Sequence, residues 1–219
     1  MMASTARRAS AVTRRDDGVC RICAAAASPG FAICTSCRDV ALALGRPLVP
    51  VTPVAFVTGS SPLYRALRQY KSGEPEVAAR QQARLAALLD VFIAHHVGCI
   101  APGGLDVCVV VPSTPTGRPP PHPLATLVRR AKSAPTLADA LVPVSPLAHR
   151  RPSAGAYRAS DEVSGKRVLL VDDVYTSGAH LQSAAAALVA AGTRALHAVV
   201  LGRFVRSDVP PPRCAHCQR

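Results

Sequence analysis

The sequence contains no tryptophan, and only four phenylalanines and four tyrosines among its 219 residues. Proteins that bind single-stranded nucleic acid without sequence preference stack the bases on aromatic side chains, so a stacking platform of that kind is not expected here. No apolar run approaches the length needed to span a bilayer. The apolar segment of a secretory signal is missing as well. These absences predict a globular protein without a membrane span, located in the cytoplasm.

Acidic residues are also scarce. Asp and Glu total 13 against 26 Lys and Arg, which gives a formal net charge of +13. Such an excess favours anionic partners, either nucleotides and pyrophosphate or nucleic acid. The arginines are spread along the chain rather than gathered in one stripe, so charge alone does not establish DNA binding. The acid-free start, residues 1–15, has the composition of a disordered basic arm or of an organellar transit peptide.

Cysteines near the start follow a metal-binding pattern. Two C-x2-C pairs, ten residues apart, are formed by Cys20, Cys23, Cys34 and Cys37. Four thiolates at this spacing can close a tetrahedral structural zinc site. So short a segment has no core of its own and needs a staple. Disulfides are the alternative, but a cytosolic protein keeps its thiols reduced. The sequence therefore predicts structural Zn2+.

The most informative stretch is Arg167–His180. Its apolar residues, Val168 to Val171, predict a strand that is buried on both faces. The adjacent carboxylates of Asp172 and Asp173 are expected to end this strand, and a Thr/Ser/Gly turn leads into a helix that Gly192 ends. In a parallel α/β sheet this turn lies at the carboxyl end of a strand, where such folds bind ligands.

This order of elements suits a phosphorylated sugar. The two carboxylates can accept hydrogen bonds from vicinal ribose hydroxyls. Residues 176–180 offer backbone N–H groups, two hydroxyls and the positive end of a helix, which together form an anion site for a phosphate. The plainer alternative is a strand end with two solvated acids beside a helix start. Asp-Asp alone would favour that alternative, but the full combination favours phosphoribosyl recognition.

The segment Val168–Leu181 resembles the phosphoribosyl-pyrophosphate (PRPP) signature of type I phosphoribosyltransferases, and VDDVYTSGAHL most resembles the ComF (competence protein F) branch. The resemblance implies a type I phosphoribosyltransferase-like (Rossmann-like) α/β fold. Its central parallel sheet is flanked by helices and preceded by a small N-terminal zinc-binding module. It makes Asp172 and Asp173 the catalytic residues. It assigns substrate binding to Val174, Tyr175, Thr176, Ser177, Gly178, Ala179 and His180. At the position of His180, family members usually carry a small hydroxylated residue.

Two further segments are expected to contact the substrate. A helix over residues 64–73 ends in Lys71 and Gly73, similar to the Lys-spacer-Gly ending of ComF-like helices; Lys71 is either a phosphate ligand or a solvated helix end. A strand over residues 106–112 precedes a polar loop, where the resemblance assigns the pyrophosphate to Thr114 and Gly117. This loop lacks the Arg-Gly-Phe-Asn-Gln-like segment expected in ComF. That departure leaves the acceptor and turnover itself open.

The remaining segments predict a strand at 54–57, a long packing helix at 76–97, a helix at 124–131 and a strand at 195–201. Residues 132–165 read as a low-order stretch. They are either a mobile loop that closes over PRPP or a disordered surface insertion. Cys99 and Cys108 are expected to be buried apolar thiols. The tail group Cys214-x-His216-Cys217 is one pair short of a metal site of its own.

The predicted organisation has four parts. Residues 1–17 form a disordered basic arm, 18–49 the zinc knuckle and linker, 50–205 a phosphoribosyltransferase-like domain, and 206–219 a Pro/Cys-containing tail. The protein is predicted to be an enzyme of the glycosyltransferase class. It transfers 5-phosphoribosyl from PRPP to an unidentified acceptor and releases pyrophosphate, with Mg2+ on the substrate phosphates. The alternative is a non-catalytic PRPP sensor or DNA-uptake adaptor that binds single-stranded DNA or a helicase-like partner. The resemblance is compatible with a homodimer.

Overall fold

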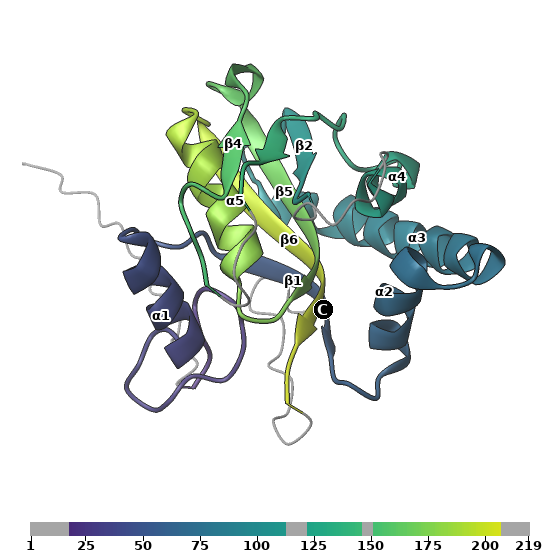
Figure 1. Cartoon of the computed structure of the whole chain (residues 1–219), viewed down its shortest axis with the longest axis horizontal. Helices are drawn as coiled ribbons and strands as arrows, with labels where there is room; N and C mark the ends of the chain where they lie inside the picture. Colours follow the sequence, from purple (N-terminus) through teal and green to yellow (C-terminus); the bar gives the residue numbers. More distant parts are fainter. Residues whose placement is uncertain (1–17, 113–121, 146–150, 207–219) are drawn as a thin grey trace, which may run out of the picture.

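The computed structural model describes residues 18–112, 122–145 and 151–206 (Figure 1). The basic arm, Thr114, Gly117 and the tail cysteines lie outside the described residues. A parallel four-stranded sheet forms the centre, in the order β1-β6-β5-β2. Its strands are β1 (Val51–Val57), β2 (Val107–Val110), β5 (Arg167–Tyr175) and β6 (Ala195–Phe204). A central parallel sheet flanked by helices confirms the predicted α/β class.

The helices divide between the two faces of the sheet (Figure 1). On one face lie α2 (Pro62–Ser72), α3 (Pro75–Ile100) and α4 (Pro123–Arg130). On the other lie α1 (Thr35–Leu44), α5 (Ala179–Ala190) and an antiparallel hairpin of β3 (Leu141–Pro143) and β4 (Tyr157–Ala159). Alternate residues of β5 feed the two cores: Val168 and Leu170 pack towards α5, Leu169 and Val171 towards α3.

The strands and helices follow local rules of the chain. Central β5 and β6 carry continuous apolar runs because both of their faces are covered by helices. The strand β1 starts at Val51, three residues earlier than expected, and accommodates Pro53 because it lies at the edge of the sheet. Helices α2, α3 and α4 each begin with proline in the first turn, where the missing N–H has no helical partner to lose.

The cysteine-containing module, residues 18–49, packs on the α5 face and shares its core. The side chain of Gln182 brackets the backbone of Val49, accepting from its N–H at 3.0 Å and donating to its carbonyl at 2.8 Å. The guanidinium of Arg46 donates to the carbonyl of Ala186 at 3.0 Å. The module is therefore fixed to α5 through polar contacts that leave its buried amide satisfied.

Two expectations about the middle of the chain were wrong. The stretch 132–165 is not low in order where the structure describes it, because β3, β4 and the 3-10 turn η1 (Asp161–Val163) pack on the α5 core through buried Tyr157 and Val163. Cys99 is exposed near the end of α3, since the apolar stripe of this helix faces the other way. Cys108 is buried as expected, and burial raises its thiol pKa to about 12.

Among the described helices, α3 is long and apolar enough to cross a membrane by length and composition, with a mean hydropathy of 1.5 over its best window. The sequence had predicted no run of that kind. Core helices of soluble proteins can have this length and composition as well. Here Leu85, Leu89 and Ile93 of α3 are buried against α2, α4 and the sheet, and 22% of the apolar window is buried in all.

Candidate functional site

We expect a ligand site between β2 and β5, because the chain leaves these two neighbouring strands towards opposite faces of the sheet. After β2 the chain continues to α4 on one face, whereas after β5 it enters α5 on the other. Open α/β sheets bind ligands at this switch point, outside the carboxyl ends of the two strands. The pairing of β2 with β5 ends at Val110 opposite Val171, and the N–H of Val111 still donates to the carbonyl of Val171 at 2.9 Å. Beyond Val171, β5 projects past the end of β2.

The aspartates occupy this projecting part, but they do not end the strand as predicted. β5 continues to Tyr175 because the longer β6 still pairs with it, Asp172 opposite Val200 and Tyr175 opposite Arg203. The backbone N–H of Asp173 donates to the Asp172 carboxylate at 2.8 Å, and that of Val174 to the Asp173 carboxylate at 2.8 Å. The two carboxylates thus accept hydrogen bonds from backbone N–H groups of β5 that lie beyond the end of β2.

Asp173 is held by the end of α2. Its carboxylate forms an ion pair with the ammonium of Lys71 and accepts a hydrogen bond from the Tyr70 hydroxyl at 2.8 Å. The Asp173 side chain is 8% exposed and that of Lys71 31% exposed. Lys71, predicted as a phosphate ligand or a solvated helix end, therefore lies at the acidic pair. Tyr70 was missed, because nothing local distinguishes it from a packing tyrosine.

Asp172 has an unusual protonation behaviour. Burial, and next the negative charge of Asp173, raise its pKa to about 8, although the ammonium of Lys71 acts in the opposite direction. The two neighbouring side chains therefore differ: the pKa of Asp172 is raised, whereas Asp173 is ion-paired with Lys71. Consecutive side chains of β5 leave opposite faces of the strand, so a ligand can meet both aspartates only beyond the end of β2. A bound cation would favour loss of the Asp172 proton.

The loop after β5 turns sharply into α5. Gly178 adopts φ +88°, and a Cβ at this position would lie 2.1 Å from the Tyr175 hydroxyl oxygen. The Ser177 hydroxyl accepts from the N–H of Ala179, the first residue of α5. The loop thus lies against the N-terminal end of a 12-residue helix. The positive end of a helix and the backbone N–H groups around it suit an anion.

A second connection joins the hairpin to the end of β2 and to the start of α5. The Tyr157 hydroxyl, from β4, lies 2.9 Å from Nδ1 of His180 and donates to the carbonyl of Pro112 at 3.4 Å. Burial, and next the charge of Asp172, raise the Tyr157 pKa. Tyr157 thus joins the chain just after β2 to the first turn of α5. The predicted loop region 132–165 does reach the candidate site, but through an ordered hairpin.

The four predicted metal ligands lie together. The Sγ atoms of Cys20, Cys23, Cys34 and Cys37 all lie within 4.8 Å of one another. All four cysteines are free thiols, and the Sγ atoms of Cys23 and Cys34 are 3.7 Å apart. A tetrahedral site with Zn–S bonds of about 2.3 Å has edges of about 3.8 Å, so the thiols fit zinc. Four thiolates leave no open ligand position, which indicates a structural site.

A buried arginine joins this cluster to the candidate loop. The guanidinium of Arg203, in β6, donates to the Cys23 carbonyl at 3.2 Å and lies 3.3 Å from the Cys23 Sγ. It also donates to the carbonyls of Tyr175 and Thr176, each at 2.9 Å. Sequence reasoning missed Arg203, because its partner Cys23 lies 180 positions away and no local motif marks the contact.

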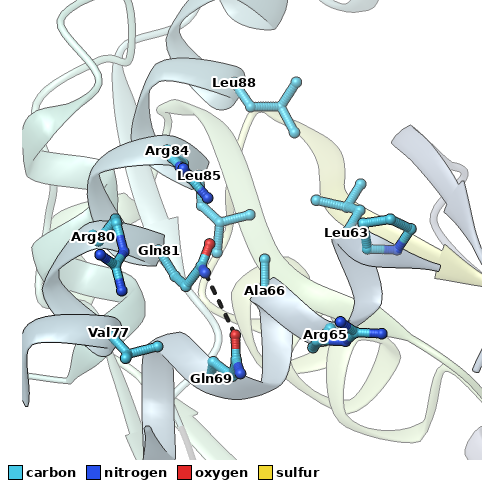
Figure 2. Close-up of a pocket in the computed structure, with 11 residues that line it drawn as sticks. Leu63, Arg65, Ala66, Gln69, Val77, Arg80, Gln81, Arg84, Leu85 and Leu88 are labelled. Atoms are coloured by element: carbon cyan, nitrogen blue, oxygen red, sulfur yellow. Dashed lines mark hydrogen bonds between the residues drawn. The ribbon is translucent and has the colours of Figure 1, made fainter. Parts of the chain in front are cut away.

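A separate groove lies between α2 and α3 (Figure 2). It encloses about 570 Å³ and contains none of the predicted site residues. Its floor includes Ala66 and Leu85, and a hydrogen bond from the Gln81 amide to the Gln69 oxygen at 3.4 Å crosses it. Its arginines are Arg65, Arg80 and Arg84. This groove was not predicted from the sequence, because its arginines come from two different helices.

Comparisons with known proteins identify no family for this chain. No family model matches the sequence, and no curated protein matches it. Several solved structures match, among them a phosphoribosyltransferase from Corynebacterium diphtheriae. That chain is 20% identical, the match covers 66% of this chain and 94% of that one, and the TM-score is 0.33. At so low a TM-score, the similarity supports no conclusion about function.

Proposed function

We propose that the protein is a PRPP-binding phosphoribosyltransferase of the ComF type. One observation carries the proposal: Asp172 and Asp173 project beyond β2 at the switch point of the sheet, directly before a glycine turn and a helix N-terminus. The acidic pair suits ribose hydroxyls, and the turn suits a phosphate a few bonds away in the same ligand. The proposal includes a cytoplasmic location, where the thiols of a four-cysteine site stay reduced.

In this proposal each group has a role that its surroundings permit. The backbone from Thr176 to Gly178, with the hydroxyls of Thr176 and Ser177, holds the 5′-phosphate. The carboxyls of Asp172 and Asp173 hold the ribose hydroxyls, and the charged Asp173 carboxylate stabilises positive charge as the C1–O bond breaks. Lys71 moves from Asp173 to a substrate phosphate. The acceptor forms a bond to C1 as the C1–O bond breaks and pyrophosphate leaves; Mg2+, when bound, would offset the negative charge of the leaving group. Positioning and electrostatics then provide the catalysis.

The direct test is calorimetric titration of PRPP with Mg2+ into the zinc-loaded protein and into the double variant Asp172→Asn/Asp173→Asn. We expect binding by the wild type and none by the double variant. Asp139→Asn is the matched control, because this carboxylate is 80% exposed and pairs with Arg129 rather than with a predicted site residue. Binding that persists in the double variant, or a folded wild type that binds no PRPP, would contradict the proposal. Pyrophosphate release with candidate acceptors would then test for turnover.

A second candidate function rests on the groove between α2 and α3. Within the described part of the chain no carboxylate forms an ion pair with Arg65, Arg80 or Arg84, although all three are exposed. Unpaired arginines around one groove favour an anionic polymer, and the alternative of a DNA-uptake adaptor needs such a surface. In this second proposal single-stranded DNA lies along the groove, and its backbone phosphates pair with the arginines.

Fluorescence anisotropy with an oligo-dT probe over a range of salt concentrations tests the adaptor. Three Arg→Gln changes at positions 65, 80 and 84 are expected to weaken binding and to flatten its salt dependence. The expected slope is roughly one log unit of affinity per log unit of salt for each phosphate contact. The control replaces exposed Arg130, Arg194 and Arg206, which keeps the net charge equal. Equal losses in both triple variants would indicate non-specific attraction, and deletion of residues 1–15 would measure the share of the basic arm.

A further inference from the structure

Arg203 carries a buried positive charge that needs a negative charge close by. The residue is 6% exposed, and an arginine side chain cannot lose its charge inside a protein. Within the described residues, no carboxylate lies within ion-pair distance of its guanidinium. Its nearest group capable of negative charge is the Cys23 sulfur, at 3.3 Å. Burial of an unpaired charge is costly, so this cation needs thiolate character in the cluster.

A loaded metal centre supplies that charge. One divalent zinc ion bound by four thiolates keeps a net negative charge, part of which faces the Arg203 guanidinium. Hydrogen bonds from outer-shell groups to metal ligands orient those ligands and tune the metal. Arg203 donates both to the Cys23 sulfur and to the Cys23 carbonyl, so it fixes this ligand at two points.

The other side of the same guanidinium holds the candidate phosphate loop. One terminal nitrogen donates to the carbonyls of Tyr175, Thr176 and Phe204, at 2.9, 2.9 and 2.7 Å. The guanidinium also stacks 5.0 Å from the centroid of the Tyr175 ring. The hydroxyl of that ring lies 3.7 Å from the Cys37 sulfur. Tyr175 and Arg203 thus connect two cluster cysteines to the backbone that enters the turn at Gly178.

We propose that Arg203 is a positioning residue that couples the four-cysteine metal centre to the loop 175–178, so that metal loading sets the geometry of the phosphate site. The coupling deepens the proposed phosphoribosyl function and rests on it only for the identity of the ligand. Loss of zinc removes the negative charge beside Arg203. The guanidinium is then no longer fixed in place, and its hydrogen bonds to the carbonyls of Tyr175 and Thr176 weaken. The metal cluster thus influences the phosphate site through Arg203 without contacting the ligand.

Hydrogen–deuterium exchange tests the coupling without any ligand. In the full chain, we expect zinc removal by a chelator to speed exchange about tenfold in the segment 174–184, the size expected for losing hydrogen bonds to a charged group. Exchange in α3, on the opposite face of the sheet, serves as the internal reference. No change in 174–184, or an equal rise in α3 from general unfolding, would overturn the proposal.

Variants separate the link from simple stability. Arg203→Gln, and with a smaller effect Arg203→Lys, is expected to release zinc faster to a chelating dye and to speed exchange in 174–184 even when zinc is bound. The matched control is Arg46→Gln, which also removes a contact between the module and α5 but touches no thiol. If Arg46→Gln speeds exchange in 174–184 as much as Arg203→Gln, the coupling through the guanidinium is wrong.

A binding measurement keeps this proposal distinct from the proposed function. Inorganic phosphate and ribose 5-phosphate are titrated into the zinc-loaded wild type, the zinc-free wild type and Arg203→Gln. The coupling predicts weaker binding, about tenfold, in the latter two. Failure of the loaded wild type to bind either probe contradicts the phosphoribosyl function alone, because the exchange result still decides the coupling. Equal binding with and without zinc contradicts the coupling alone.

Discussion

The ammonium of Lys71 and the hydroxyl of Tyr70 meet the same carboxylate oxygen of Asp173, so two consecutive residues of α2 converge on one atom of β5. An ion pair next to a charge-assisted hydrogen bond fixes the end of α2 against Asp173. The pair is only partly shielded from solvent, because the Lys71 side chain is 31% exposed. Its contribution to stability therefore lies between that of a buried and that of a surface pair.

The first prediction concerns this pair. Lys71→Met is expected to lower the free energy of unfolding by about 1–2 kcal/mol, because it leaves the Asp173 charge without its cation. Arg129→Met, which breaks an exposed pair with Asp139 at 3.4 Å, is the control and should cost less than about 0.5 kcal/mol. Urea unfolding measures both. Adding Asp173→Asn to Lys71→Met should recover part of the loss, and no recovery would argue against direct coupling.

The second prediction is a pH dependence. The folded-state pKa of Asp172 is raised to about 8, above its unfolded value of about 3.9, so its contribution to stability is full below about pH 4 and is lost as pH rises through 8. Asp172→Asn removes that loss. Its stability relative to the wild type should rise between pH 5 and 8, by at most about 1.4 kcal/mol per pH unit.

Thermal and urea unfolding at several pH values measure this difference. Asp139→Asn, an exposed carboxylate, should show no comparable trend between pH 5 and 8. If the stability difference between Asp172→Asn and the wild type is constant over this range, the pKa of Asp172 is not raised in the folded protein.

A feature of this site could be predicted from the sequence only where the residues that form it lie close together in the chain. The turn and helix after β5 and the two C-x2-C pairs were predicted, because their determinants lie within a few residues of one another. The contact of Tyr70 with Asp173 spans 103 positions, and that of Arg203 with Cys23 spans 180. No periodicity or motif encodes such pairs, since they depend on how the sheet and the module pack.

The end of β5 shows the same limit. Two consecutive aspartates are poor strand formers, so ending the strand before them was reasonable from propensity. Tertiary context overrides that preference, because β6 extends to Phe204 and continues to pair with β5 up to Tyr175. The hairpin of β3 and β4 was missed for a related reason: its strands are only three residues each and gain their stability from Tyr157 on the α5 core.

The third prediction concerns the turn. Gly178→Ala forces a side chain into left-handed backbone and against the Tyr175 ring, whose hydroxyl oxygen would lie 2.1 Å from the new Cβ. Gly165→Ala is the matched control, with φ +69° but nothing within 4 Å. The control should cost about 1–2 kcal/mol for backbone strain alone. Gly178→Ala should cost clearly more and should also weaken binding of ribose 5-phosphate. Equal costs in urea unfolding would show that the Tyr175 contact is not tight.

The last prediction concerns the metal. Freshly purified, reduced protein should contain about one zinc per chain, as expected for a closed four-thiolate site. Cys34→Ser removes one ligand and should release most of the zinc, lower the melting temperature and reduce solubility, because Cys20, Cys23 and Cys37 belong to the core that the module shares with α5. Cys99→Ser, at an exposed thiol outside the cluster, should keep the zinc content of the wild type. Zinc content is measured by elemental analysis and stability by thermal unfolding. A wild type with well under one zinc per chain would contradict the metal site. A Cys34→Ser variant that keeps its zinc would show instead that the remaining three thiols suffice, and the tetrahedral assignment would then have to be replaced.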